Sequence, residues 1–115
     1  MKQNVLLDKT FAFACEIIRL CRQIRLKEKE FMLTRQLLKA ATSIGANAEE
    51  AVAAHSSADF IAKLTNSQKE ARETRYWLRL ITTSGVYDCS KHLNSIDEIN
   101  KLIAAIIITT KKRNL

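Results

Sequence analysis

The sequence lacks proline altogether and has only two glycines in 115 residues. Proline interrupts helices and glycine weakens them, so their scarcity favours a chain made largely of α-helix. The sequence also lacks any apolar run of about twenty residues, which argues against a transmembrane helix. Because the length suits one domain with a real core, we predict a single all-α domain over residues 1–115.

Other features that are scarce concern location and cysteine chemistry. The segment MKQNVLLDKT has no apolar stretch typical of signal peptides, so we expect a cytoplasmic protein without membrane association. Cys15, Cys21 and Cys89 form no CxxC pair and no metal-ligand spacing. Because three cysteines cannot all pair within one chain, we expect reduced, partly buried thiols.

Two segments with apolar residues at helical spacing fill the first half of the chain, from about Val5 to Leu26 and from about Phe31 to Ala54. The link LKEKEF contains no residue that forces a turn, but the two apolar stripes do not stay in register as one helix, so we predict a break. Gly45 is tolerable inside the second helix if another backbone comes close. The predicted core positions are Leu6, Phe13, Ile17, Leu20, Cys21 and Ile24, then Leu33, Leu37, Ala40, Ile44, Ala48 and Ala51.

Two further helices are predicted in the second half. The third begins at SSAD, where Ser56 fits an N-cap and Asp59 a first-turn acid, and it ends at Gly85. The fourth begins at SIDE, where Ser95 and Glu98 have capping-box spacing. The predicted core positions are Phe60, Leu64, Ala71, Thr74, Leu78 and Ile81, then Ile96, Ile99, Ile103 and Ile106. Four amphipathic helices with short connections predict an antiparallel up-and-down four-helix bundle.

The last predicted helix is apolar on two sides. At about 100° per residue, Ile108 lies roughly opposite Ile99 and Ile106. A helix that is apolar most of the way round is usually buried on more than one side. We therefore expect the bundle to form a homo-oligomer.

Five polar residues lie on or beside the apolar stripes of the second and third helices: Ser43, Asn47, Glu50, Glu70 and Glu73. A carboxylate that faces a core is costly unless it is paired or hydrogen-bonded. The favoured interpretation is a structural polar network that fixes the register between two long helices. In this network Ser43 and Asn47 would donate to Glu70, or Lys39 would approach Glu50.

The alternative interpretation of these carboxylates is a metal site formed by Glu50, Glu70 and Glu73. Di-iron bundles use Glu-x-x-His pairs on two helices, whereas this sequence has no histidine three residues after any glutamate. His55 and His92 fall at predicted helix ends or loops. Because glycine-rich phosphate loops and G-x-S-x-G elbows are also missing, we predict a protein that is not an enzyme and uses no metal or cofactor.

Nineteen basic and twelve acidic side chains leave a net charge of +7. On the predicted helices the outward-facing basic residues form three groups: Arg72, Arg75 and Arg79; Arg19 and Arg22; and Lys111, Lys112 and Arg113. They form either a solvated surface that keeps a small oligomer soluble or a surface that contacts nucleic-acid phosphates. The sequence has no aromatic-rich RNA platform, zinc knuckle or helix-turn-helix signature, so such binding would involve the backbone. An oligomer would copy these contacts and raise avidity.

Two blocks, LTRQLLKAATSIGANAEEA and DFIAKLTNSQKEARETRYWLRLITTSG, give the chain a family resemblance over about residues 10 to 110. The chain resembles bacterial four-helix-bundle proteins encoded in intervening sequences of 23S rRNA genes, often described as ribosomal proteins. Residues Ser43, Asn47 and Glu50 fall on that family's S-I-x-x-N-x-x-E motif. Its K-E-A-x-E-T and Y-W-L motifs cover Glu70, Glu73, Tyr76 and Trp77.

The resemblance implies an up-and-down bundle that assembles into homopentameric, barrel-like rings. Related accessory proteins of diversity-generating retroelements bind nucleic acid and a reverse transcriptase through a basic surface, but the family itself has no settled molecular function. LKEKEF replaces the usual proline-containing link. Our leading hypothesis is therefore non-specific binding of RNA or DNA backbone by a basic oligomer. The alternative is a homo-oligomeric scaffold that docks another protein, in which the positive charge serves solubility only.

Overall fold

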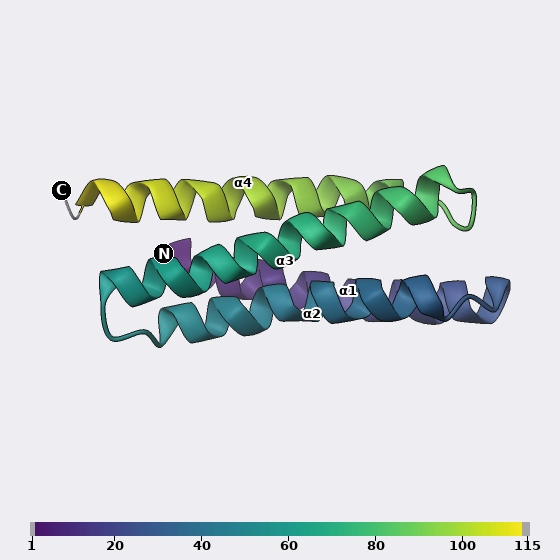
Figure 1. The fold of residues 1–115 in the computed structure, drawn as a ribbon, viewed down its shortest axis with the longest axis horizontal. Helices are drawn as coiled ribbons and strands as arrows, with labels where there is room; N and C mark the ends of the chain where they lie inside the picture. Colours follow the sequence, from purple (N-terminus) through teal and green to yellow (C-terminus); the bar gives the residue numbers. More distant parts are fainter. Residues whose placement is uncertain (1, 114–115) are drawn as a thin grey trace.

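The structure, a computed structural model, describes residues 2–113, and these contain four α-helices and no strand. The helices are α1 (Lys2–Glu28), α2 (Met32–Val52), α3 (Ser57–Thr83) and α4 (Ser90–Arg113). Successive helices run antiparallel along the length of the molecule, and α1 begins at the end where α4 finishes (Figure 1). The predicted all-α four-helix bundle is therefore confirmed. None of the described helices is long and apolar enough to cross a membrane.

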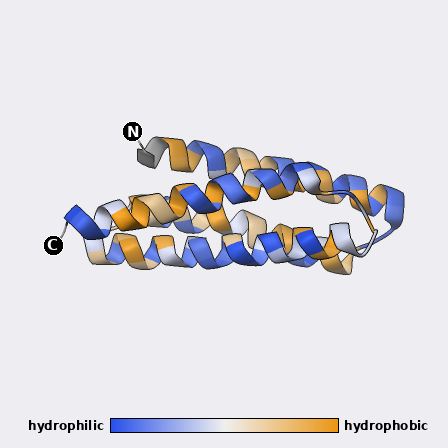
Figure 2. Cartoon of the chain, turned by 90° about the horizontal axis from the view of Figure 1, so that it is seen from above, coloured by the Kyte–Doolittle hydropathy of each residue, from blue (hydrophilic) through white to orange (hydrophobic). Residues whose placement is uncertain are grey.

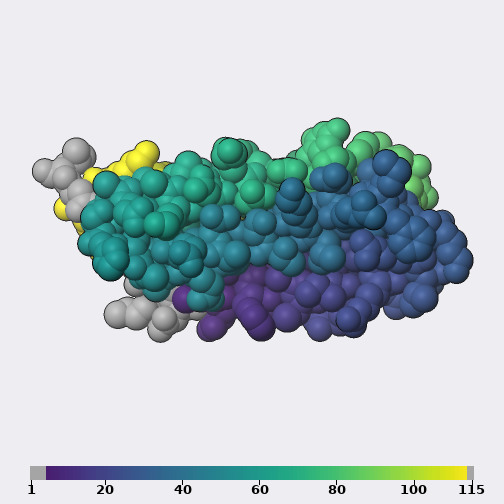
Figure 3. All heavy atoms as spheres, turned by 60° about the horizontal axis from the view of Figure 1, so that its bottom comes forward, coloured from purple at the N-terminus to yellow at the C-terminus, as the bar shows by residue number. Residues whose placement is uncertain are grey.

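The four helices form a closed cycle of neighbours. Helix α1 packs on α2 and α4, and α3 also packs on α2 and α4, so α1 and α3 occupy diagonal corners. In a space-filling view, α1 (purple) and α2 (blue) lie side by side along one face (Figure 3). The resulting rod measures 50 × 21 × 21 Å.

The core follows the predicted apolar stripes. Hydrophobic and hydrophilic residues alternate along every helix, as expected for amphipathic helices (Figure 2). Every predicted core position is buried except Leu33, which is half-buried. Each large aliphatic side chain removed from water contributes about 1.5–3 kcal/mol, so this shared core is the main stabilising feature of the bundle.

The predicted break between the first two helices is confirmed, and its cause lies in two residues. Lys29 has a positive φ of 56°, which turns the chain out of α1. The Glu30 carboxylate then accepts hydrogen bonds from the backbone N–H groups of Met32 (3.0 Å), Leu33 (2.8 Å) and Thr34 (3.0 Å). These groups have no partner within a helix's first turn, so a single side chain starts α2.

The beginning and end of α3 agree with the prediction. The Ser56 hydroxyl accepts a hydrogen bond from the backbone N–H of Asp59 at 3.1 Å, as an N-cap does. Gly85 follows the last turn with φ of 82°, a left-handed conformation that suits glycine.

The predicted start of α4 at SIDE is wrong. The helix begins at Ser90, where the Asp88 carboxylate accepts hydrogen bonds from the backbone N–H (3.0 Å) and the hydroxyl of Ser90. Ser95 lies inside the helix and donates to the Lys91 carbonyl. Sequence reasoning selected the capping-box spacing of Ser95 and Glu98 and overlooked the Asp-Cys-Ser segment, in which a short acidic side chain turns back on the backbone.

Gly45 is not a position of unusually close packing. A Cβ atom added there would lie 3.5 Å from Thr10 Oγ1 and 3.6 Å from the Thr10 carbonyl oxygen of α1. These are ordinary van der Waals distances, so α1 leaves room for a methyl group. The backbone of α1 therefore does come close to Gly45, as the sequence predicts, but it leaves room for a side chain as small as alanine.

Candidate nucleic-acid interface

Three basic side chains line the outward face of α3. Lys69, Arg72 and Arg79 are exposed, and no carboxylate of residues 5–113 lies within ion-pair distance of them. Positions separated by three, four or seven residues share one face of a helix, so these cations form a single stripe. We call Lys69, Arg72 and Arg79 the α3 stripe.

Arg75 differs from the other arginines of α3. Its side chain is half-buried, and its Nε donates to the Asp97 carboxylate of α4 at 2.8 Å. Because this ion pair neutralises the guanidinium and ties α3 to α4, Arg75 contributes little to an anion-binding surface. The equivalence of Arg72, Arg75 and Arg79 suggested by the sequence therefore does not hold in the fold.

The other predicted basic residues lie elsewhere on the bundle. Arg19 and Arg22 are exposed on α1, which is diagonal to α3, so this pair points away from the α3 stripe. Lys111, Lys112 and Arg113 are exposed at the end of α4, at the far end of the rod from the turn that follows α3 (Figure 1). The predicted basic residues thus form three separate groups on the described surface.

The predicted polar network between α2 and α3 does not form among the described residues. The Ser43 hydroxyl donates to the Lys39 carbonyl (2.7 Å), and the Asn47 amide donates to the Ser43 carbonyl (2.8 Å), both within α2. Glu50 is exposed, and no ion pair joins it to Lys39 in the part of the chain that the structure describes. These side chains lie on the shoulder of the apolar stripe, where water or the helix's own carbonyls satisfy them.

The two carboxylates of the predicted network that lie on α3, Glu70 and Glu73, also make no hydrogen bond to α2 among the described residues. Glu70 is half-buried, whereas Glu73 is exposed and accepts a hydrogen bond from the Trp77 indole of the same helix at 3.4 Å. The polar link that does join α2 to α3 is the buried Ser67 hydroxyl, which donates to the Ile44 carbonyl at 2.7 Å. The sequence pattern that could have predicted this contact is a serine on the apolar stripe of α3, and the sequence analysis did not identify it.

An exposed aromatic side chain lies within the α3 stripe. Tyr76 is 54% exposed, and its ring contacts Trp77 edge to face, with centroids 5.1 Å apart. An open hollow of about 160 Å³ beside it is lined by Tyr76, Arg79, Leu80 and Thr83. Sequence reasoning attached Tyr76 only to the family motif. The sequence pattern that could have identified this exposed ring is a tyrosine four residues after Arg72 and three residues before Arg79.

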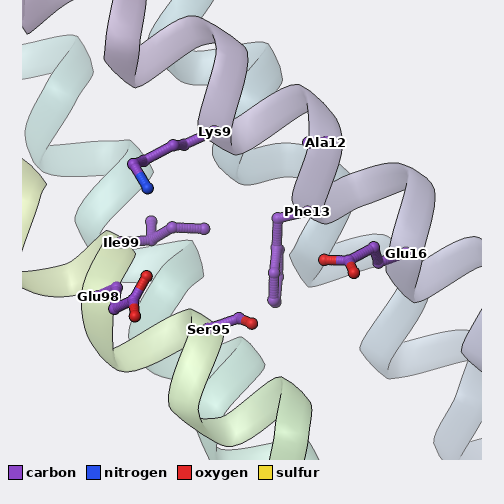
Figure 4. A pocket seen from close by; sticks show the side chains of 7 residues that line it. All are labelled: Lys9, Ala12, Phe13, Glu16, Ser95, Glu98 and Ile99. Carbon is purple, nitrogen blue, oxygen red and sulfur yellow. The ribbon is translucent and has the colours of Figure 1, made fainter.

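The seam between α1 and α4 contains a second group of charged residues. A hollow of about 200 Å³ lies between Lys9 and Glu16 of α1 and Ser95 and Glu98 of α4, with Phe13 against it (Figure 4). The lining carries both signs of charge, so it does not favour an anion. Among residues 5–113, no group of three or more His, Cys, Asp or Glu side chains is placed to hold a metal ion.

A larger hollow of about 340 Å³ continues along this seam and includes His92 and Lys91. His92 Nδ1 is buried without a hydrogen-bond partner. Burial lowers the pKa of His92, nearby Glu16 opposes this, and Lys91 adds to it. The imidazole is therefore mostly neutral near pH 7.

The cysteines are free thiols: Cys21 and Cys89 are buried and Cys15 is half-buried. Burial raises the pKa of Cys21 to about 11 and also raises the pKa of Cys89. Because the thiolate is the reactive form, these two side chains are poor nucleophiles near pH 7.

Comparison with known proteins places the chain in a family. The family model described as 23S rRNA-intervening sequence protein matches residues 2–107. A crystal structure of a protein of unknown function from the S23 ribosomal protein family of Bacteroides thetaiotaomicron shares 44% identity with a TM-score of 0.88. The match covers 93% of this chain and 98% of that one. No curated protein matches the chain.

Proposed function

The chain belongs to the 23S rRNA-intervening sequence protein family, and from that premise we propose that it is a non-enzymatic oligomer that binds RNA or DNA. The α3 stripe carries this proposal, because its exposed cations have no carboxylate partner among residues 5–113. A row of unpaired cations attracts the phosphate backbone and contains no information about base sequence. The binding is therefore expected to be non-specific.

Self-association supplies the avidity that one short stripe lacks. Ile108 is 54% exposed on α4, opposite the buried side of that helix, as an isoleucine at a subunit contact would be in an isolated protomer. Assembly into a ring, as the family resemblance implies, would repeat the α3 stripe around one particle. Several weak phosphate contacts would then act together.

The test is binding of a labelled duplex and a labelled structured RNA across a salt series, with particle mass measured by light scattering on the same sample. The change is Arg72→Glu with Arg79→Glu, which leaves the Arg75–Asp97 ion pair intact. We expect binding to collapse while particle mass and melting temperature stay unchanged. Alanine at both positions should reduce the log–log salt slope by about 0.9 for each phosphate contact removed.

The matched control is Arg19→Glu with Arg22→Glu on the diagonal helix, which makes the same change in net charge. A stripe-specific interface predicts a smaller loss of binding for this control. Equal losses for both pairs would mean that net charge alone drives binding. Absence of binding by the unaltered protein at low salt would contradict the proposal.

A homo-oligomeric scaffold that docks another protein is the second candidate, and apolar side chains around the α1–α2 link favour it. Leu26 is 73% exposed and Met32 is 79% exposed, with Phe31 between them in the chain. Clusters of exposed apolar residues mark protein contact sites. Leu26→Lys with Met32→Lys should lower particle mass, and with it the avidity for nucleic acid, if the cluster is a subunit contact. An unchanged particle mass would leave the cluster available to dock another protein.

A further inference from the structure

We propose that Tyr76 is a stacking platform for an unpaired nucleobase, which makes the α3 stripe selective for single-stranded RNA or DNA over duplex. The proposal rests on the proposed function, because it concerns the same surface. It adds the class of nucleic acid and the residue that distinguishes it.

One face of α3 brings Tyr76 between two arginines. Arg72 lies four residues before Tyr76 and Arg79 three residues after it, so both arginines neighbour the ring on the helix surface. The two arginines are about 10 Å apart along the axis, at 1.5 Å per residue. A strand that follows the helix would place phosphates at the two arginines and a base over the tyrosine between them.

The Tyr76 ring is supported by its neighbour Trp77. Trp77 is half-buried and meets Tyr76 edge to face, with an interplanar angle of 74°. The tyrosine is thereby held from one side while more than half of its surface stays exposed. Holding an aromatic ring in place before binding lowers the entropy cost of stacking a base on it.

The charges around the ring also determine which side of it a strand can use. Glu73 is exposed on the side of the ring where Trp77 lies, and it repels phosphates there. On the side that faces α4, the Asp97 carboxylate is neutralised by Arg75. The strand therefore runs on the side of Tyr76 that faces α4, over Arg72 and Arg79.

Duplex nucleic acid cannot use this arrangement fully. Its bases are stacked on one another and are not available to an exposed ring, so a duplex contacts only the cations. Every base has an aromatic face, so stacking on tyrosine discriminates between single and double strands without reading sequence.

The experiment compares Tyr76→Ala and Tyr76→Phe by fluorescence anisotropy at low salt. The probes are labelled oligo(U), oligo(dT), an abasic strand and a duplex, all of one length. We expect the unaltered protein to prefer the two base-bearing strands. Tyr76→Ala should weaken their binding about tenfold, to the level of the abasic strand, while Tyr76→Phe keeps the ring and the affinity. Duplex binding should be unchanged in both variants.

The remaining outcomes separate this inference from the proposed function. Equal binding of strands and duplex, unaffected by Tyr76→Ala, would overturn the stacking role and leave phosphate binding intact. No binding of any probe would overturn both. A fall in particle mass with Tyr76→Ala would place the ring at a subunit contact and overturn the inference. Emission of Trp77, the single tryptophan, gives an independent readout, because a base stacked beside it should quench it.

Discussion

The α2–α3 seam and the α1–α4 seam are built in opposite ways. Helix α2 buries four alanines, Ala40, Ala41, Ala48 and Ala51, and α2 and α3 share the most extensive contact in the bundle. The α1–α4 contact is the least extensive, and two hollows lie along it. Short side chains let two helices approach closely, whereas the α1–α4 hollow is lined by longer ones such as Lys9, Phe13 and Glu16. The α2–α3 seam is therefore closely packed and stabilises the fold, whereas the α1–α4 seam leaves two hollows beside it.

The largest expected loss of stability comes from adding side-chain volume to the closely packed α2–α3 seam. Ala71 is fully buried on α3, so Ala71→Leu forces neighbouring side chains out of their preferred rotamers and should cost about 1–3 kcal/mol. The matched change is Ala12→Leu at the α1–α4 hollow, where the side chain is exposed and a near-neutral effect is expected. Urea denaturation of both variants measures the difference. Equal losses would mean that the two seams are equally packed.

A smaller loss of stability should follow removal of the hydrogen bond between Ser67 and the Ile44 carbonyl in the α2–α3 seam. Ser67→Ala deletes the donor to the Ile44 carbonyl and should cost about 0.5–1.5 kcal/mol. Ser43→Ala is the control, because that hydroxyl bonds only within its own helix. Thermal melting compares the two variants. A larger loss of stability for Ser43→Ala would show that polar residues at the edge of the α2 stripe, rather than Ser67, fix the register between α2 and α3.

A stabilising change is expected next to the α1–α2 seam. Gly45→Ala adds a methyl group at ordinary contact distance from Thr10 and lowers the entropy of the unfolded chain. It should raise the free energy of unfolding by about 0.5–1 kcal/mol. In contrast, Gly85→Ala should lower it, because its φ of 82° strains any other residue. A destabilised Gly45→Ala protein would mean that α1 and α2 pack more tightly than these distances indicate.

The smallest effect concerns pH and the open seam. The pKa of His92 is lowered in the folded state by burial, so the unfolded chain binds more protons below about pH 6.5. The stability contributed by neutral His92 is therefore complete above about pH 6.5 and is lost as the pH falls from there through the lower pKa of the folded state. His92→Gln should flatten this part of the stability profile, measured by urea denaturation between pH 7.5 and about 5.

Sequence periodicity predicted the interior because burial repeats with the helical period. Ile17, Leu64 and Ile103 could be assigned to the core without a structure. The starts of α2 and α4 were harder, because Glu30 and Asp88 act from before the helix and outside the usual capping patterns. Each of these side chains lies two residues before the first residue of its helix, one position earlier than an N-cap.

The candidate interface shows a different limit of prediction from sequence. Helical spacing placed Arg72, Arg79, Arg19 and Arg22 on outward faces, but it could not show that α1 and α3 are diagonal. The relation between two helices depends on how all four pack. The same applies to Arg75, whose partner Asp97 lies 22 residues away on another helix. Asn47 shows the converse, because a polar side chain at the edge of an apolar stripe can be satisfied by a carbonyl of its own helix without a partner helix.

The antiparallel course of the four helices also determines how the molecule can be held. Lys2 and Arg113, the first and last described residues, lie at the same end of the rod (Figure 1). Arg79 lies near the end of α3, toward the opposite end. A protomer attached to a bead or a sensor chip through either end would stand upright and offer the arginine-bearing end of α3 to solution.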